Sequence, residues 1–238
     1  MSDPLYIYQT DDCFRGNPET QTHYIFPTPI GLGEFSEDKQ REYKEAFNRA
    51  VEADADGPKV INDGSRQLVH SPCPDPIDGL SASKGIHEHL RPCIDHLTAA
   101  VRRWGNESFG WTKTNPEWFC ATAWHNTTKK GGYQFIHNHC NSILTVTYYF
   151  DLDPAHETTT LWKAQNNTSP FFNADIHTVT TGNLEYVSPN MQEGQYLIFP
   201  SQLNHSVREN VIDKPRRTLS LNFLPKEIAY AHYRLKLG

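Results

Sequence analysis

Two stretches in the first half of the chain carry apolar residues at helical spacing. In each, a serine suited to begin a helix is followed by apolar positions that recur every three to four residues. Pro92 lies inside the second stretch, so the sequence predicts either a kink or a new helix at that point. We expect helices over residues 36–57 and 83–105, joined by an irregular connection rich in Pro, Gly, Asp and Ser.

After residue 105 the pattern changes to short apolar runs separated by Gly, Asn, Pro and Asp. Such runs predict β-strands, and helices followed by strands indicate an α+β chain that is mainly β. We expect the helices to pack on one face of a β-barrel or sandwich. A short first strand is expected within 22–35, and the further predicted strands are 117–124, 133–137, 143–150, 183–187, 195–199 and 216–224.

The composition fits one folded domain. A chain of 238 residues with 37% hydrophobic residues can bury a sizeable core, and β-barrels of this length are routinely single domains. We expect a single domain over 1–238, with a helical part at 1–105, a β-core at 106–225 and a tail at 226–238. The absence of an apolar run of about 18 residues argues against a membrane span.

Charge and cysteine content narrow the class of protein further. The formal net charge of −6 argues against a broad nucleic-acid-binding face. The five cysteines are odd in number and form no CxxC pair, which disfavours both a disulfide framework and a zinc ribbon. The N-terminus lacks a basic segment followed by an apolar core, so we expect no signal peptide and a cytoplasmic protein.

Three histidines in the second half of the chain have the spacing of a metal site. His137 and His139 would point to the same face if they lie on one strand, because side chains alternate along a strand. His205 follows the apolar run 196–200, where a strand would end at a barrel mouth. Three imidazoles suit Fe(II), Zn, Cu or Ni better than Mg or Ca. An isolated HxH pair is more often just polar residues at a strand edge, and the third histidine and a nearby arginine favour the metal site.

The last predicted strand has one polar face, made by alternate residues from Arg216 to Asn222. Arg216 and Thr218 could bind a carboxylate through the guanidinium fork and a hydroxyl. The alternative is a strand edge that faces water. Asp151 and Asp153 lie a strand length beyond His137, so we interpret them as turn residues rather than as metal ligands.

Six short motifs follow one another between residues 24 and 225. They are FPTP at 26–29, WHN at 124–126, HNHCNS at 137–142, YY at 148–149, FPSQLNH at 199–205 and RRTLSLN at 216–222. Through this set of motifs and their order, the chain resembles the Fe(II)/2-oxoglutarate-dependent oxygenases. The resemblance implies a double-stranded β-helix, or jelly-roll, core with the N-terminal helices packed on one face.

The resemblance also implies roles for individual residues. His137 and His205 match the first and the distal iron ligand, and Arg216 matches the residue that binds the far carboxylate of 2-oxoglutarate, assisted by Thr218. Positions at which relatives contact the cosubstrate correspond here to Asn126 and Tyr149.

The activity implied by the resemblance is an Fe(II)- and 2-oxoglutarate-dependent dioxygenase. It would hydroxylate a C–H bond of a small-molecule or peptide substrate and release succinate and CO₂. The sequence identifies neither that substrate nor the oligomeric state. The chain departs from the family at His139, because most of the superfamily has Asp or Glu there. His139 is either a neutral third ligand, which we favour, or swings aside and leaves iron with two histidines and an extra water.

Two other functions fit parts of the pattern. A cupin-type three-histidine enzyme, an isomerase or a cosubstrate-independent dioxygenase, is suggested by Gly194, Pro200, His205 and Asn210, which approximate the second cupin motif. Against it, the glutamate expected shortly after HxH is absent from residues 140–147. A non-catalytic jelly-roll binding module is the least favoured, because it gives no reason for three histidines together with Arg216.

Overall fold

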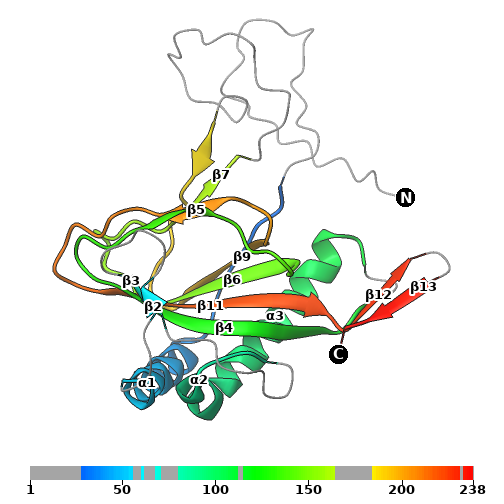
Figure 1. Ribbon diagram of the computed structural model, residues 1–238, viewed down its shortest axis with the longest axis horizontal. Helices are drawn as coiled ribbons and strands as arrows, with labels where there is room; N and C mark the ends of the chain where they lie inside the picture. Colours follow the sequence, from blue (N-terminus) through cyan, green and yellow to red (C-terminus); the bar gives the residue numbers. More distant parts are fainter. Residues whose placement is uncertain are drawn as a thin grey trace, which may run out of the picture.

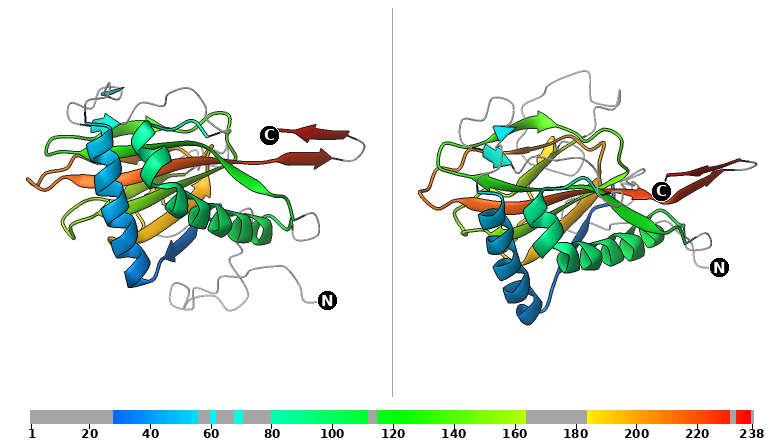
Figure 2. Two further views of the ribbon diagram at one scale, coloured as in Figure 1. Left: turned by 90° about the horizontal axis from the view of Figure 1, so that it is seen from below. Right: turned by 60° about the horizontal axis from the view of Figure 1, so that its bottom comes forward.

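The computed structural model describes residues 28–55, 60–61, 68–70, 80–111, 115–163, 184–230 and 233–237. Within these residues, a large and a small β-sheet are stacked, and three helices cover the outer face of the large sheet (Figures 1 and 2). The Phe26-Pro27 half of the FPTP motif lies outside the described residues. None of the helices in the described ranges is long and apolar enough to span a membrane.

Both sheets are built from antiparallel neighbours. The large sheet has the order β1 (Gly31–Glu34), β9 (Gln195–Pro200), β6 (Leu144–Asp151), β11 (Arg216–Pro225), β4 (Trp118–Thr128), β3 (Leu68–His70) and β2 (Val60–Ile61). The small sheet has the order β5 (Gln134–His137), β10 (His205–Val207), β7 (Thr159–Trp162) and β8 (Tyr186–Val187). Several neighbours are distant in sequence, such as β9 and β1 or β11 and β4, as the jelly-roll expectation requires.

The central strands of the large sheet separate an apolar face from a polar one. On β11, alternate residues from Leu219 to Phe223 pack in the main hydrophobic core, while Thr218 and Ser220 are buried on the opposite side. On β6 the same alternation directs Val146, Tyr148 and Phe150 toward the core. The polar face predicted for the last strand therefore exists, and it is turned toward the small sheet rather than toward water.

The helices supply the other half of the main core. They are α1 (Glu37–Ala53), α2 (Lys84–His89) and α3 (Arg91–Ser108). Phe47 of α1 stacks on Phe150 of β6 with 4.1 Å between ring centroids, which fixes α1 against the large sheet. Ser83 caps α2 by accepting a hydrogen bond from the Ile86 amide at 3.4 Å. Pro92 lies in the first turn of α3, so it begins a new helix rather than kinking a longer one.

The structure also contains strands that the sequence pattern did not predict. The expected tail at 226–238 contains an antiparallel hairpin, β12 (Glu227–Tyr230) and β13 (Tyr233–Lys236), in which Ile228 lies opposite Leu235. The hairpin projects from the body of the molecule (Figure 2). Strands β2 and β3 lie in the expected irregular connection, and β7 and β10 were not expected at all. These strands have two to four residues, which is too short for a periodicity to be recognised.

Candidate metal and cosubstrate site

The three predicted histidines lie together between the two sheets. His137 ends β5 and lies directly opposite His205, the first residue of β10. The side-chain nitrogens of His137, His139 and His205 that could bind a metal all lie within 4.8 Å of one another. Ring centroids are 4.2 Å apart for His137 and His205, and 4.8 Å apart for His139 and His205. This geometry could hold one metal ion.

His139 reaches the cluster in a different way from that expected. Strand β5 ends at His137, so the two histidines do not share the face of one strand. After His139 the chain reverses direction through Asn141, whose φ of 60° is in the left-handed region that asparagine tolerates. The expectation of a shared strand face was therefore wrong, although both rings converge on the same point, 5.3 Å apart.

Backbone carbonyls fix the rings of His137 and His205. The Nδ1 atom of His137 lies 2.8 Å from the Phe135 carbonyl, and Nδ1 of His205 lies 2.9 Å from the Leu203 carbonyl. Because a carbonyl can only accept a hydrogen bond, each Nδ1 carries the proton and each Nε2 has a lone pair rather than a hydrogen. Both rings are thus held in the tautomer that binds a metal through Nε2.

Burial keeps two of the three imidazoles neutral. It lowers the pKa of His205 to about 3, with a further contribution from the neighbouring His137. Burial also lowers the pKa of His139 to about 4, although the hydrogen bond that His139 donates to Asn222 Oδ1 acts in the opposite direction. Neutral imidazoles are the form that coordinates a metal, so no proton has to be displaced near neutral pH.

Gln134 contacts the metal-facing nitrogen of one histidine. Its Nε2 lies 3.2 Å from Nε2 of His137. Because Nδ1 of His137 is the protonated nitrogen, the amide donates into the Nε2 lone pair. A metal bound at this nitrogen would therefore have to displace the Gln134 amide.

Arg216, on β11 of the large sheet, lies between the sheets with the histidines and is 3% exposed. Its Nε has no hydrogen-bond partner within the described ranges, and no carboxylate there forms an ion pair with it. Its guanidinium lies over the Tyr149 ring at 5.2 Å, and one terminal nitrogen lies 3.5 Å from Thr159 Oγ1. Burial lowers the pKa of Arg216, yet an arginine remains charged. A buried cation with an unused donor fits a ligand carboxylate.

One cavity joins the histidines to Arg216. Within it, Asn126 donates to Ser220 Oγ at 3.0 Å and to Thr218 Oγ1 at 3.4 Å, which orders the floor of the cavity. The residues that line it are Trp124, Asn126, Gln134, His137, His139, Thr147, Thr159, His205, Val207, Arg216, Thr218 and Ser220. The set includes six of the seven residues that the sequence pointed to as metal or cosubstrate contacts.

Tyr149, the seventh, lies behind the cavity wall. Its hydroxyl donates to Thr159 Oγ1 at 2.9 Å and accepts from the Thr159 amide at 3.3 Å. It thereby holds a residue that does line the cavity. Thr159 itself was missed because no strand was predicted around it. Thr147, also missed, follows from the alternation that places it two residues before Tyr149 on β6.

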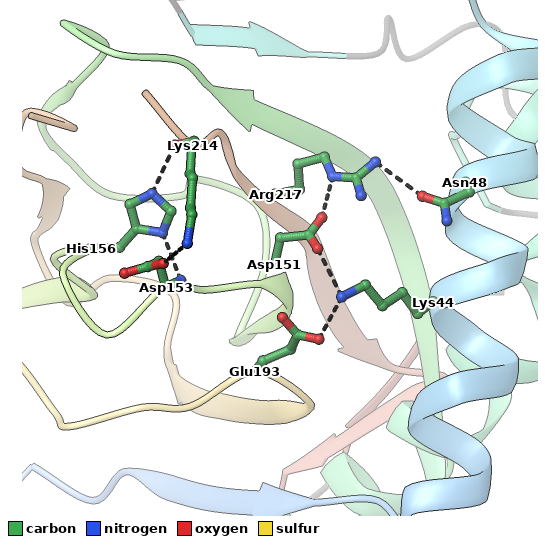
Figure 3. Close-up of polar contacts among 8 residues, drawn as sticks. All are labelled: Lys44, Asn48, Asp151, Asp153, His156, Glu193, Lys214 and Arg217. Atoms are coloured by element: carbon green, nitrogen blue, oxygen red, sulfur yellow. Dashed lines mark hydrogen bonds and ion pairs between the residues drawn. The ribbon is translucent and has the colours of Figure 1, made fainter. Parts of the chain in front are cut away.

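Asp151 and Asp153, at and just beyond the end of β6, do not line this cavity. Figure 3 shows the side chains that they contact instead. Asp151 is ion-paired with Arg217 and with Lys44 of α1, the latter at 2.9 Å. Asp151 is the last residue of β6, so its interpretation as a turn residue was wrong. Asp153 does lie in a turn, where its carboxylate accepts from the Ala155 amide at 3.0 Å.

The segment that carries this site matches a known family. Residues 122–222 match the family model described as "Putative 2OG-Fe(II) oxygenase". This match identifies residues 122–222 as a 2OG-Fe(II) oxygenase domain. The matched segment runs from β4 to β11 and includes all seven residues that the sequence pointed to as metal or cosubstrate contacts. The oxygenase is therefore favoured over the cupin and the binding module, and its cofactors are Fe(II) and 2-oxoglutarate.

Solved structures share the fold of this oxygenase at low sequence identity. SnoK, a non-heme alpha ketoglutarate dependent carbocyclase from nogalamycin biosynthesis, is 13% identical with a TM-score of 0.58, over 84% of this chain and 81% of that one. A 2OG-Fe(II) oxygenase family oxidoreductase from Burkholderia pseudomallei is 12% identical with a TM-score of 0.53, over 82% and 83%. The epimerase SnoN, solved with Fe3+, alpha ketoglutarate and nogalamycin RO, is 11% identical with a TM-score of 0.57, over 84% and 80%.

At these identities the similarity concerns the fold, and it confirms the expected jelly-roll class. Among curated protein sequences, none matches this chain.

Proposed function

We propose that His137, His139 and His205 bind the Fe(II) of this oxygenase through their Nε2 atoms. The proposal is supported by the tautomer of His137 and His205, whose Nδ1 atoms face backbone carbonyls, and by the closeness of all three rings. Three neutral ligands leave the iron with its full double positive charge. That charge strengthens the attraction of the site for the dianionic cosubstrate relative to a site with a carboxylate ligand.

Arg216 is proposed to bind the carboxylate of 2-oxoglutarate that lies farther from the metal. The observation that carries this assignment is a buried guanidinium without an acidic partner in the described residues, in the same cavity as the histidines. Its fork can donate two parallel hydrogen bonds to one carboxylate. Thr218 would add a hydroxyl, and Asn126 would keep that hydroxyl in place through the contact at 3.4 Å.

The apolar wall behind this cavity suits the same chemistry. Tyr149, Leu197 and Phe199 are fully buried in a second, smaller core. The ring centroids of Phe199 and His205 are 4.9 Å apart. Such a wall excludes water and strengthens the ion pair between Arg216 and a carboxylate. When bound, iron and 2-oxoglutarate supply the activation of O₂ and the oxidising power, while the side chains named here bind, orient and shield.

The proposed reaction is hydroxylation of a C–H bond of a small molecule or peptide, with release of succinate and CO₂. We further propose that residues 1–238 form one functional unit and that the protein acts in the cytoplasm. The absence of a disulfide among the cysteines of the described ranges supports a reducing compartment.

The test is an anaerobic titration of the Fe(II)-loaded protein with 2-oxoglutarate, followed by visible absorption. A chelate of iron and cosubstrate should give a charge-transfer band that saturates. The same titration of Arg216→Met should require about 100-fold more cosubstrate, because one buried charge-assisted pair contributes about 3 kcal/mol. Loaded iron without any band would support the cupin alternative instead.

Turnover gives an independent check. After O₂ is admitted, succinate should appear in proportion to the O₂ consumed, even without the substrate, through slow uncoupled turnover. Consumption of O₂ without succinate would contradict a 2-oxoglutarate-dependent reaction.

A further inference from the structure

The ring of His139 is oriented by different groups from those that orient His137 and His205. His137 and His205 use a backbone carbonyl two residues earlier in the chain. His139 has side-chain partners instead, with Nδ1 2.7 Å from Asn222 Oδ1 and 3.1 Å from Thr145 Oγ1. Its ring therefore depends on residues of β11 and β6, which are 83 and 6 positions away in the sequence.

The contacts around Asn222 form a connected and partly buried group. Thr145 Oγ1 lies 2.9 Å from Asn222 Oδ1 and 2.9 Å from Ser201 Oγ, and both Thr145 and Ser201 are fully buried. One assignment uses each hydrogen once: Ser201 donates to Thr145, and Thr145 and His139 Nδ1–H both donate to Asn222 Oδ1. In that assignment His139 keeps a lone pair on Nε2, where it faces the other two histidines.

The backbone of His139 is fixed separately from its ring. Its amide donates to the Ser201 carbonyl at 2.9 Å, and its carbonyl accepts from Gln202 at 3.0 Å. A substitution at Asn222 therefore leaves the path of the chain at residue 139 intact. What it removes is the acceptor that selects the tautomer and the angle of the ring.

We propose that Asn222, supported by Thr145 and Ser201, is the positioning residue that makes His139 a metal ligand. The inference rests on the proposed metal site and goes beyond it, because it explains how this chain can use a histidine where a carboxylate is usual. A carboxylate ligand needs no choice of tautomer, whereas an imidazole binds only if its other nitrogen carries the proton. The side-chain group on β6 and β11 provides that selection.

The experiment compares the binding of Co(II), a spectroscopic stand-in for Fe(II), by the full chain and its variants. Asn222→Leu removes the acceptor and should weaken Co(II) binding about 10- to 100-fold. Its visible Co(II) spectrum should also shift toward that of His139→Ala, which a merely structural role would not produce. Asn222→Asp keeps an acceptor at the same position and should bind Co(II) within a few-fold of the wild type.

Two further variants complete the comparison. Thr145→Val removes one hydroxyl from the group with little change in volume, and should weaken Co(II) binding a few-fold. This variant keeps the proposal testable if Asn222→Leu fails to fold. Asn138→Ala is the matched control, because this exposed asparagine lies between the two histidines but contacts Asn204 instead. It should bind Co(II) as the wild type does. Unfolding of the metal-free proteins in urea separates loss of metal from loss of the fold.

The outcomes distinguish the role of Asn222 from that of His139 and from the proposed function. Wild-type affinity and spectrum in Asn222→Leu, or equal weakness of the Leu and Asp variants, would overturn the role of Asn222. A wild-type spectrum in His139→Ala would overturn it as well, and would leave an oxygenase with two histidine ligands. Failure of the proposed function is distinguishable, since the wild type itself would then show no cosubstrate band.

Discussion

Arg216 and Arg217 are adjacent in the sequence and lie on opposite faces of the large sheet. Arg217 faces α1, where it pairs with Asp151, donates to Asn48 at 3.0 Å and packs over the Phe47 ring (Figure 3). Arg216 faces the small sheet, is more deeply buried and has no acidic partner in the described residues. Arg217 thus forms an ion pair and a hydrogen bond within the protein, whereas the Nε of Arg216 has no hydrogen-bond partner in the described residues.

The different partners of Arg216 and Arg217 indicate that one face of β11 serves stability and the other serves function. Burying a charge is costly unless a partner compensates for it, so an unpaired buried arginine persists only where a ligand completes it. The helix-covered face carries contacts that hold the fold together. The face toward the small sheet carries the groups that we propose to bind the cosubstrate. Variants on the two faces should therefore fail in different ways.

The largest contrast is expected between two equally buried histidines. His205, toward the small sheet, is 5% exposed, and His125, toward the helices, is 6% exposed and lies 3.0 Å from Asp54. His205→Ala should weaken Fe(II) binding more than about 100-fold, since it removes a ligand rather than a supporting contact. His125→Ala should keep metal binding and lower the free energy of unfolding by about 2 kcal/mol, the contribution of a buried charge-assisted hydrogen bond.

Chelator competition and urea unfolding of the metal-free proteins measure the two effects. Iron binding retained by His205→Ala would contradict the role of His205 as a ligand. Iron binding lost by a folded His125→Ala would contradict a purely structural role of His125.

The two arginines give the next largest contrast. Arg217→Met should lower the free energy of unfolding by about 2 kcal/mol, because it breaks a partly buried ion pair and a hydrogen bond. Arg216→Met should change the stability of the ligand-free protein by less than about 1 kcal/mol, because it removes a buried charge that has no acidic partner in the described residues. Cosubstrate at about 100 times its Kd should stabilise the loaded Arg217→Met by about 2.7 kcal/mol. At the same concentration, Arg216→Met should gain almost nothing.

Urea unfolding with and without cosubstrate measures both quantities. A ligand-free Arg216→Met that is as unstable as Arg217→Met would show that Arg216 is structural.

The sequence predicted the parts of this site that depend on local pattern. His137, His205, Arg216 and Thr218 were recognisable from motif spacing and from alternation along a strand, and the structure brings all four to one cavity. The polar face of β11 was predicted for the same reason. An inward position of this face was also favoured, but the strands that cover it were not identified, because their pairing is long-range.

Other parts depend on the register between distant segments. Asn222 lies opposite Thr145 because of the register in which β11 and β6 pair. No sequence pattern near His139 predicts that contact. The same is true of Thr159, which a four-residue strand brings next to Arg216. His125 and Asp54 form a buried pair across 71 residues, and neither was singled out. Alternation predicts which residues share a face, but not which partners they meet.

The smallest contrast concerns pH and the ion pairs of the helix-covered face. Burial alone would raise the pKa of Asp151, but its bonds with Arg217 and Lys44 outweigh burial and lower the pKa below the ordinary value of 3.8. A carboxylate with a lowered pKa contributes stability above its unfolded-state pKa and loses it as pH falls through the folded-state value. Asp151→Asn should therefore cost about 1 kcal/mol at pH 7, and the difference from the wild type should shrink below about pH 4.

Urea unfolding at several pH values between 7 and 3 measures this effect. Asp213→Asn is the control, because Asp213 pairs with Lys130 on an exposed loop with 86% of its side chain accessible, so the variant should match the wild type throughout. Cosubstrate affinity at pH 7 should be equal in all three proteins, since Asp151 lies outside the cavity that contains Arg216. A weaker cosubstrate affinity in Asp151→Asn would mean that the two faces of β11 are coupled, with the pairing of Arg217 helping to orient its neighbour.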